Sequence, residues 1–157
     1  LSPSMDIQVA SNFERLLYDL NEGDDLQTID AMKNIKEKGK HIINQEKLDK
    51  INVDFLSARM SEEEVLKTIS KVYEKFKIVL DPHSAIGYGA FDKINLDGNN
   101  IVLATAHPCK FPDAIKKAIN LKEDLPKELM FVMEEKENYD ILENDVEKIK
   151  QHIKERI

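Results

Sequence analysis

Hydrophobic residues near the start of the chain recur every three or four positions, which is the spacing of one face of a helix. The apolar members of this face are Phe13, Leu16, Leu17 and Leu20. Ser11 and Glu14 have the spacing of a capping box, in which a hydroxyl and a carboxylate bind free amides of the first turn. The pattern predicts an amphipathic helix that begins near Ser11 and ends near Gly23.

Further helices are expected within residues 1–60. One is predicted over residues 26–38, with Gly39 as its stop. Its inward positions are expected to be Ile29, Met32 and Ile35. A shorter helix is predicted between residues 44 and 50. Residues 53–58 form a short apolar run that favours a strand, although a run of this length does not exclude a helix.

The clearest helix signal begins at residue 61. Ser61 and Glu64 form a second capping box, and the extra carboxylates of this turn favour the positive end of the helix dipole. A wide apolar stripe follows, at Val65, Leu66, Ile69, Val72, Tyr73 and Phe76. This segment is predicted to be a helix.

Two short apolar runs, with the segment between them, predict a βαβ unit. Residues 78–80 are largely β-branched, and residues 101–104 lack alternation, as expected of a strand buried on both faces. A helix is expected from about Ser84, and a turn at residues 97–100. The two strands should therefore lie parallel, with a right-handed crossover between them. Pro112 is expected to open the next helix.

The last part of the chain has weaker signals. A short helix is predicted from Pro126, and residues 139–142 are interpreted as a strand. Asn144 and Glu147 have the spacing of a cap for a last helix. The apolar face of that helix consists of Val146, Ile149 and Ile153.

These elements together predict an α/β fold with a small, mostly parallel sheet flanked by helices. The chain is expected to form a mainly helical segment (1–60), a helix followed by the βαβ unit (61–120), and a helical tail (121–157). No internal repeat interrupts this order.

Composition restricts the class of protein. The 157 residues are 41% hydrophobic and 34% charged, which is enough for a folded core. A net charge of −7 argues against nucleic acid and anionic membranes as partners. No apolar run reaches the roughly 20 residues of a membrane span, and no secretory signal begins the chain, so a cytoplasmic location is expected. The single Cys excludes an internal disulfide, and the absence of an initial Met suggests a fragment.

Polar residues follow both strands of the predicted βαβ unit. The run DPHS at residues 81–84 follows the first strand, and the run TAHP at residues 105–108 follows the second. Because the carboxyl ends of parallel strands meet at one edge, these runs are expected to form one ligand site. The small residues of the intervening helix, including Gly87 and Gly89, allow close approach of either a neighbouring helix or a flat cofactor ring.

Two other chemistries are conceivable for the same residues. Asp81, His83 and His107 could form a metal triad, but no His or Glu pair at helical spacing supports a metal. Ser84, His107 and Asp81 could form a hydrolase triad, but no Gly-x-Ser-x-Gly elbow surrounds Ser84. Cys109 lies at the same edge, and no motif marks it as a nucleophile. Neither alternative is favoured, and no metal is predicted.

Three ordered motifs carry a resemblance to a known family. LSPSMDI at residues 1–7 with SNFER at 11–15, DPHSA at 81–85, and LATAHPCKFP at 103–112 resemble elements of the threonine synthase family. The second matches its DPH[ST]A element and the third its ATAHPxKFP element. Cys109 stands where Ala is commoner. The resemblance covers essentially the whole chain and corresponds to the C-terminal portion of the family's enzyme.

The resemblance implies a pyridoxal-phosphate enzyme of fold type II, the tryptophan-synthase-β type, of which this chain is an incomplete part. Such an enzyme converts O-phosphohomoserine and water to threonine and phosphate. By motif position Thr105 would face the pyridine nitrogen of the cofactor. Asp81, Ser84, Ala106 and His107 are expected beside the cofactor.

The resemblance also implies what this chain lacks. The lysine that forms the Schiff base and the loop that binds the cofactor phosphate belong to the N-terminal portion, and Lys110 is not that lysine. No catalytic residue is therefore expected here, and the isolated chain is predicted to be inactive. An apolar surface should pack against the missing portion, or drive self-association. A non-catalytic ligand-binding or interaction module of the same family is the alternative.

Overall fold

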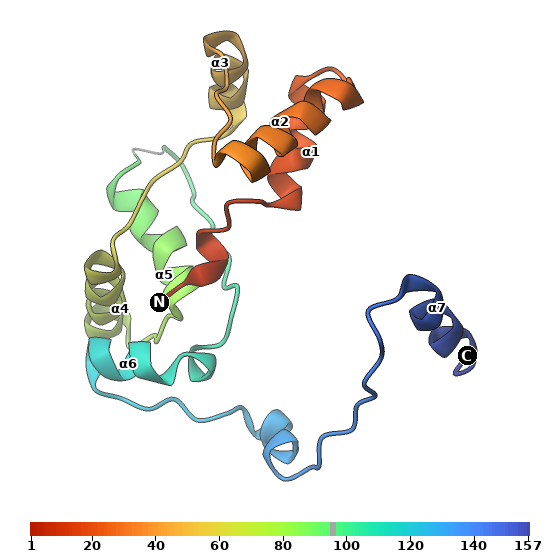
Figure 1. Ribbon diagram of the computed structural model, residues 1–157. Coiled ribbons are helices and arrows are strands. Elements are labelled where there is room, and N and C mark those ends of the chain that lie inside the picture. The colour runs from red at the N-terminus through yellow and green to blue at the C-terminus, as the bar shows by residue number, and fades with distance from the viewer. Residues whose placement is uncertain (95–96) are drawn as a thin grey trace. The chain divides into compact units, whose positions relative to one another are not determined.

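The computed structural model describes residues 1–94 and 97–157, and the order of the α-helices can be followed in Figure 1. The α-helices are α1 (Ser11–Leu20), α2 (Asp25–Lys38), α3 (Gln45–Asp54), α4 (Glu62–Phe76), α5 (Pro82–Gly89), α6 (Pro112–Ile119) and α7 (Val146–Lys154). The 3-10 helices are η1 (Pro3–Met5), η2 (Ala90–Asp92), η3 (Pro108–Lys110) and η4 (Lys127–Met133). The chain divides into two units, Leu1–Asp124 and Leu125–Ile157.

Helix α4 begins at the capping box that the sequence predicts. The Glu64 amide donates to Ser61 Oγ at 3.2 Å, and the Ser61 amide donates to Glu64 Oε2 at 2.6 Å. The Lys93 ammonium lies 2.7 Å from Glu64 Oε1. Hydrogen bonds from Lys93 and then from the Ser61 amide lower the pKa of the Glu64 carboxyl from 4.5 to about 2. Lys93 thus joins the start of α4 to the segment after η2.

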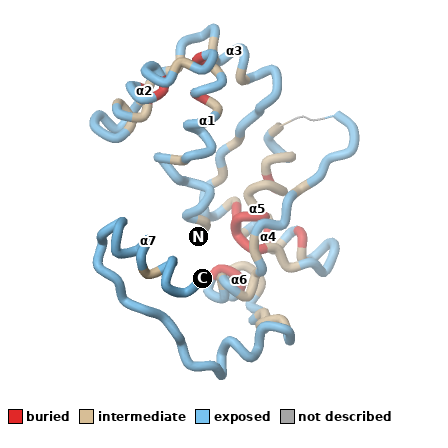
Figure 2. The backbone as a smooth tube through the Cα atoms, turned by 90° about the vertical axis from the view of Figure 1, so that its right-hand side faces the viewer, coloured by how far each residue is buried: buried red, intermediate tan, exposed pale blue. Residues whose placement is uncertain are grey.

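The core of the first unit lies where α4 contacts α5 and α6. Its fully buried apolar side chains are Val65, Ile69, Ala85 and Ile115. Partly buried residues, among them Val79 and Leu80, pack against them. Figure 2 shows the buried stretches of these helices in red. The predicted helix at 61–76 and the helix opened by Pro112 are therefore confirmed.

Helices α1 and α2 pack as a pair with a small core of their own. Leu17 and Ala31 are buried, and Asn21 Nδ2 donates to Thr28 Oγ1 at 3.0 Å. Gly39 ends α2 with φ +71°, a conformation that glycine adopts without strain, as predicted. The expected inward position of Ile29 is wrong, because that side chain is 58% exposed and the buried face of α2 lies at Thr28 and Ala31.

The prediction of an α/β fold with a parallel sheet is wrong. Within residues 1–94 and 97–157 there is no β-strand. Residues 78–80 connect α4 directly to α5, where Val79 and Leu80 pack on helices. Residues 101–104 are irregular, with Ile101 87% and Leu103 75% exposed. An apolar run indicates that a segment tends to be buried, but it does not by itself indicate a strand. A strand also requires a second backbone with which it can form hydrogen bonds.

Other strand and cap assignments are corrected as well. Residues 53 and 54 belong to α3, residues 55–58 are irregular, and 139–142 are irregular too. Ser11 lies inside α1, whose N-cap Ala10 has no side chain that accepts a hydrogen bond. The cap of α7 is Asp145, one residue after the expected Asn144. The β-propensity of these short runs is overridden by the absence of a pairing partner in the described chain.

The second unit contains η4 and α7, and none of its residues is buried. No helix in either described range is both long enough and apolar enough to pass through a membrane.

Candidate functional site

Asp81 is the N-cap of α5 and lies in the core of the first unit. Its side chain is fully buried, and its carboxylate accepts hydrogen bonds from the amides of His83 at 2.9 Å and Ser84 at 3.3 Å. An aspartate at this position satisfies amides that the first turn leaves free. Pro82 follows at the first helical position, where its missing N–H is not needed. The sequence Asp-Pro therefore fixes the start of this helix.

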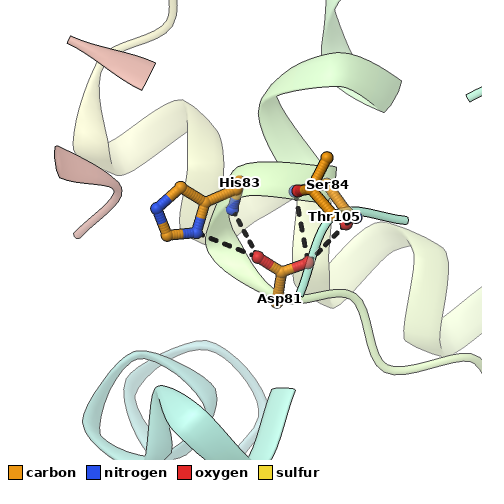
Figure 3. Close-up of polar contacts among 4 residues, drawn as sticks. All are labelled: Asp81, His83, Ser84 and Thr105. Carbon is orange, nitrogen blue, oxygen red and sulfur yellow. Dashed lines mark hydrogen bonds and ion pairs between the residues drawn. The ribbon is translucent and has the colours of Figure 1, made fainter. Parts of the chain in front are cut away.

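The hydroxyl of Ser84 connects this cap to the second motif (Figure 3). Ser84 Oγ donates to Asp81 Oδ2, and the backbone amide of Thr105 donates to Ser84 Oγ at 3.1 Å. The two motifs that the sequence predicts to form one site do meet here. They meet through a helix N-terminus and an irregular segment, and not at the edge of a sheet.

Thr105 lies on the outer side of this network. Ser84 is 2% exposed, whereas Thr105 is an exposed residue. The Thr105 hydroxyl makes no hydrogen bond within the described part of the chain. Ala106, next along the chain, is half-buried. The neutral hydroxyl of Thr105 thus belongs to a residue whose backbone amide is held by Ser84.

His83 occupies the opposite side of the Asp81 carboxylate. Its Nδ1 lies 3.0 Å from Asp81 Oδ1, and its ring lies against Phe111 with the ring centroids 4.8 Å apart. The ring is 6% exposed, and Nε2 has no hydrogen-bond partner among the described residues. Asp81 thus contacts both a histidine and a serine, one through each carboxylate oxygen.

His107 does not join this cluster as either alternative chemistry requires. Its Nδ1 accepts a hydrogen bond from the Cys109 amide at 3.2 Å and so caps η3. Ser84 donates to Asp81 and not to a histidine, which is not the arrangement of a hydrolase triad. In the described part of the chain no group of three His, Cys, Asp or Glu side chains is placed to hold a metal ion.

Gly89 of α5 is closely packed, whereas a side chain at Gly87 would make only ordinary van der Waals contact. A Cβ at Gly89 would overlap the end of the Met60 side chain and lie 3.1 Å from Thr68 Oγ1 of α4. A Cβ at Gly87 would lie 3.5 Å from Val102 Cγ1. Close approach of Met60 and α4 therefore accounts for Gly89, the first of the two explanations that the sequence leaves open.

Two features of the site are not anticipated from the sequence. The sequence predicts a helix from about Ser84, whereas α5 is capped by Asp81, and the spacing of an aspartate followed three residues later by a polar side chain could have indicated it. The contact of His83 with Phe111 has no local signal, because it joins segments 28 residues apart.

Comparisons with known proteins agree with the motifs. A family model described as "Threonine synthase, C-terminal" matches residues 84–153. Threonine synthase of Pseudomonas aeruginosa is 38% identical over 152 residues, which cover 95% of this chain and 32% of that protein. Threonine synthase of Saccharomyces cerevisiae is 36% identical, with 100% of this chain and 36% of that protein covered.

A solved structure gives the same result. The crystal structure of PLP-bound threonine synthase from Brucella melitensis superimposes with a TM-score of 0.78 and 38% identity, covering 98% of this chain and 33% of that one. The fold of this chain therefore has a counterpart within a PLP-bound enzyme. The chain belongs to the threonine synthase family, and it spans about a third of the length of the curated relatives it matches.

Proposed function

We propose that this chain supplies the C-terminal part of a pyridoxal-phosphate-dependent threonine synthase. The complete enzyme would convert O-phosphohomoserine and water to threonine and phosphate. The observation that carries the proposal is the contact between Ser84 Oγ and the Thr105 amide, 3.1 Å apart, which joins the two family motifs. The kinship to threonine synthases over nearly all of the chain supports it.

The residues present fit the cofactor. Thr105 is an exposed residue whose hydroxyl makes no hydrogen bond in the described chain, and such a hydroxyl is suited to the pyridine nitrogen of pyridoxal phosphate. A neutral hydroxyl there does not hold that nitrogen protonated, which moderates the capacity of the bound ring to accept electrons. Ala106 and His107 follow Thr105 and are assigned to the same side. Asp81 and Ser84 are buried, and Ser84 Oγ accepts a hydrogen bond from the Thr105 backbone amide.

The remaining two thirds of the enzyme are needed for activity in this proposal. The family resemblance implies that the cofactor-binding lysine and the phosphate loop belong to that portion. Three large apolar side chains are exposed to water: Ile101 (87%), Leu103 (75%) and Ile78 (55%). Burying such surface would lower the free energy of the protein. We assign these side chains to the contact with the remaining portion. The isolated chain is then inactive, and it self-associates through the same surface.

A reducing compartment suits the protein. The single cysteine, Cys109, has a free and partly buried thiol. Free thiols remain reduced in the cytoplasm, because glutathione and thioredoxin maintain a reducing environment there. We propose that the protein is cytoplasmic.

The test compares two proteins, the 157-residue chain and the same chain joined to a lysine-bearing portion of a threonine synthase. Each is mixed with pyridoxal phosphate, and the visible absorbance of the cofactor and the release of phosphate from O-phosphohomoserine are recorded. The joined protein should bind cofactor and turn over, and the chain alone should do neither. Turnover by the chain alone, or none by the joined protein, would contradict the proposal.

A matched pair of variants in the joined protein examines the role of Thr105. Thr105→Val removes the hydroxyl at nearly constant volume, and kcat should fall about tenfold, the effect of one lost hydrogen bond of the stronger kind. Thr28→Val is the control, because Thr28 is a threonine of the α1–α2 pair with its own local partners. Equal kcat values for the two variants would show that the Thr105 hydroxyl has no role in the site.

A further inference from the structure

We propose that Ser84 is a positioning residue for Thr105, and that Asp81 orients the Ser84 hydroxyl without contacting the cofactor. This inference rests on the proposed function, because it concerns how Thr105 is presented. In this inference Ser84 and Asp81 hold Thr105 in place, and Thr105 faces the cofactor.

The direction of each hydrogen bond follows from the chemistry of the groups. An ionised carboxylate only accepts hydrogen bonds, and a hydroxyl has one proton and two lone pairs. The proton of Ser84 is therefore committed to Asp81 Oδ2, which leaves its lone pairs toward the Thr105 amide. Asp81 Oδ1 is occupied by the amide and the ring of His83, so the carboxylate cannot turn away.

The Thr105 amide is the point at which its segment is held. No other backbone or side-chain hydrogen bond involves residues 101–106 within the described part of the chain. The anchor itself is rigid, because Ser84 is 2% and Asp81 1% exposed and Ala85 of the same turn belongs to the core. The Thr105 hydroxyl therefore takes its place from α5.

The first experiment measures amide hydrogen exchange in the unaltered 157-residue chain. The amides of Ala104 and Ala106 make no hydrogen bond in the described structure, so they serve as internal references. Thr105 should exchange more slowly than both neighbours, by about two- to tenfold for one hydrogen bond of ordinary strength. Equal rates for the three amides would overturn the inference without any mutation.

The second experiment changes the acceptor. Ser84→Ala should abolish the extra protection of Thr105, whereas Ser84→Thr keeps a hydroxyl and should restore it. Ser70→Ala is the matched control, because the Ser70 hydroxyl bonds Glu74 on α4, away from Thr105. Exchange at Ile69, in the core, reports whether each variant is folded. Protection of Thr105 that survives in folded Ser84→Ala would refute the role of Ser84.

The third measurement uses the chain joined to the lysine-bearing portion. Because Ser84 acts only through Thr105, Ser84→Ala should lower kcat by at most the roughly tenfold expected for Thr105→Val, with little change in KM. The visible band of bound pyridoxal phosphate should shift in Ser84→Ala and return in Ser84→Thr. A merely structural loss would lower the amount of active protein without moving the band.

The two proposals fail in different ways. If the unaltered joined protein shows neither cofactor band nor turnover, the proposed function fails, whatever the exchange at Thr105. If it is active while Ser84→Ala leaves the band and kcat unchanged, the positioning role alone fails.

Discussion

Helices α5 and α7 are nearly equal in length and begin in the same way, yet they differ completely in burial. Asp81 caps α5 and Asp145 caps α7, each accepting hydrogen bonds from two amides of the first turn. Five residues of α5 are buried, and none of α7 is. In Figure 2 α7 has no red stretch, whereas α5 has.

The difference teaches that a local signal makes a helix and a partner surface buries it. The apolar face of α7 is as regular as that of a core helix, but Val146 is 64%, Ile149 37% and Ile153 51% exposed. Packing provides most of the stability of helices in proteins. The proposal made for Ile101 and Leu103, contact with the rest of the enzyme, therefore extends to the face of α7.

The largest expected effect compares two isoleucines. Ile69→Ala in α4 should lower the free energy of unfolding by about 2–5 kcal/mol, because it leaves a cavity in the core around α5. Ile149→Ala in α7 should change it by less than about 0.5 kcal/mol, as for a surface site. Urea unfolding of both variants provides the measurement. Similar losses would show that α7 is packed in the isolated chain.

A smaller effect compares the two caps. Asp81→Ala should cost about 2 kcal/mol, because it removes a cap and leaves buried amides and the Ser84 hydroxyl without their acceptor. Asp145→Ala should cost clearly less, because water replaces the exposed carboxylate. Thermal unfolding of the two variants side by side checks the order. A larger loss for Asp145→Ala would reverse the comparison.

The smallest effect concerns acid. The folded state lowers the pKa of Glu64 to about 2 from 4.5, so the ionised carboxyl stabilises the folded first unit above pH 4.5. This contribution should fall away as the pH drops from 4.5 toward 2. Melting temperatures of the unaltered chain and of Glu64→Gln should therefore converge over that window. A constant difference between the two proteins would show that Lys93 and Ser61 do not hold the carboxylate ionised.

Much of the helical structure could be predicted from the sequence, because its signals are local. The capping box at Ser61 and the glycine stop at Gly39 each act within a few residues. The two polar motifs were also expected to meet, and they do so between Ser84 and Thr105. Local pattern was sufficient at Ser61 and Gly39, but at the start of α1 it was not, because Ser11 lies inside the helix and does not cap it.

The sheet could not be predicted correctly, because strand formation depends on a second backbone. Residues 78–80 and 101–104 have the composition of buried strands, but the described chain provides no strand beside them. The contacts of His83 with Phe111 and of Met60 with Gly89 likewise join α5 to residues that precede other helices. Such contacts are determined by tertiary packing, and no local pattern in a single sequence predicts them.

Amide hydrogen exchange across the chain, alone and joined to the lysine-bearing portion, tests the central claim most directly. Exchange in the core of α4, α5 and α6 should be slow in both forms. Residues 101–104 and α7 should exchange rapidly in the isolated chain, measured at a dilution where it is monomeric, and become protected on joining. Protection of these segments in the isolated chain, or rapid exchange in an active joined enzyme, would contradict the account.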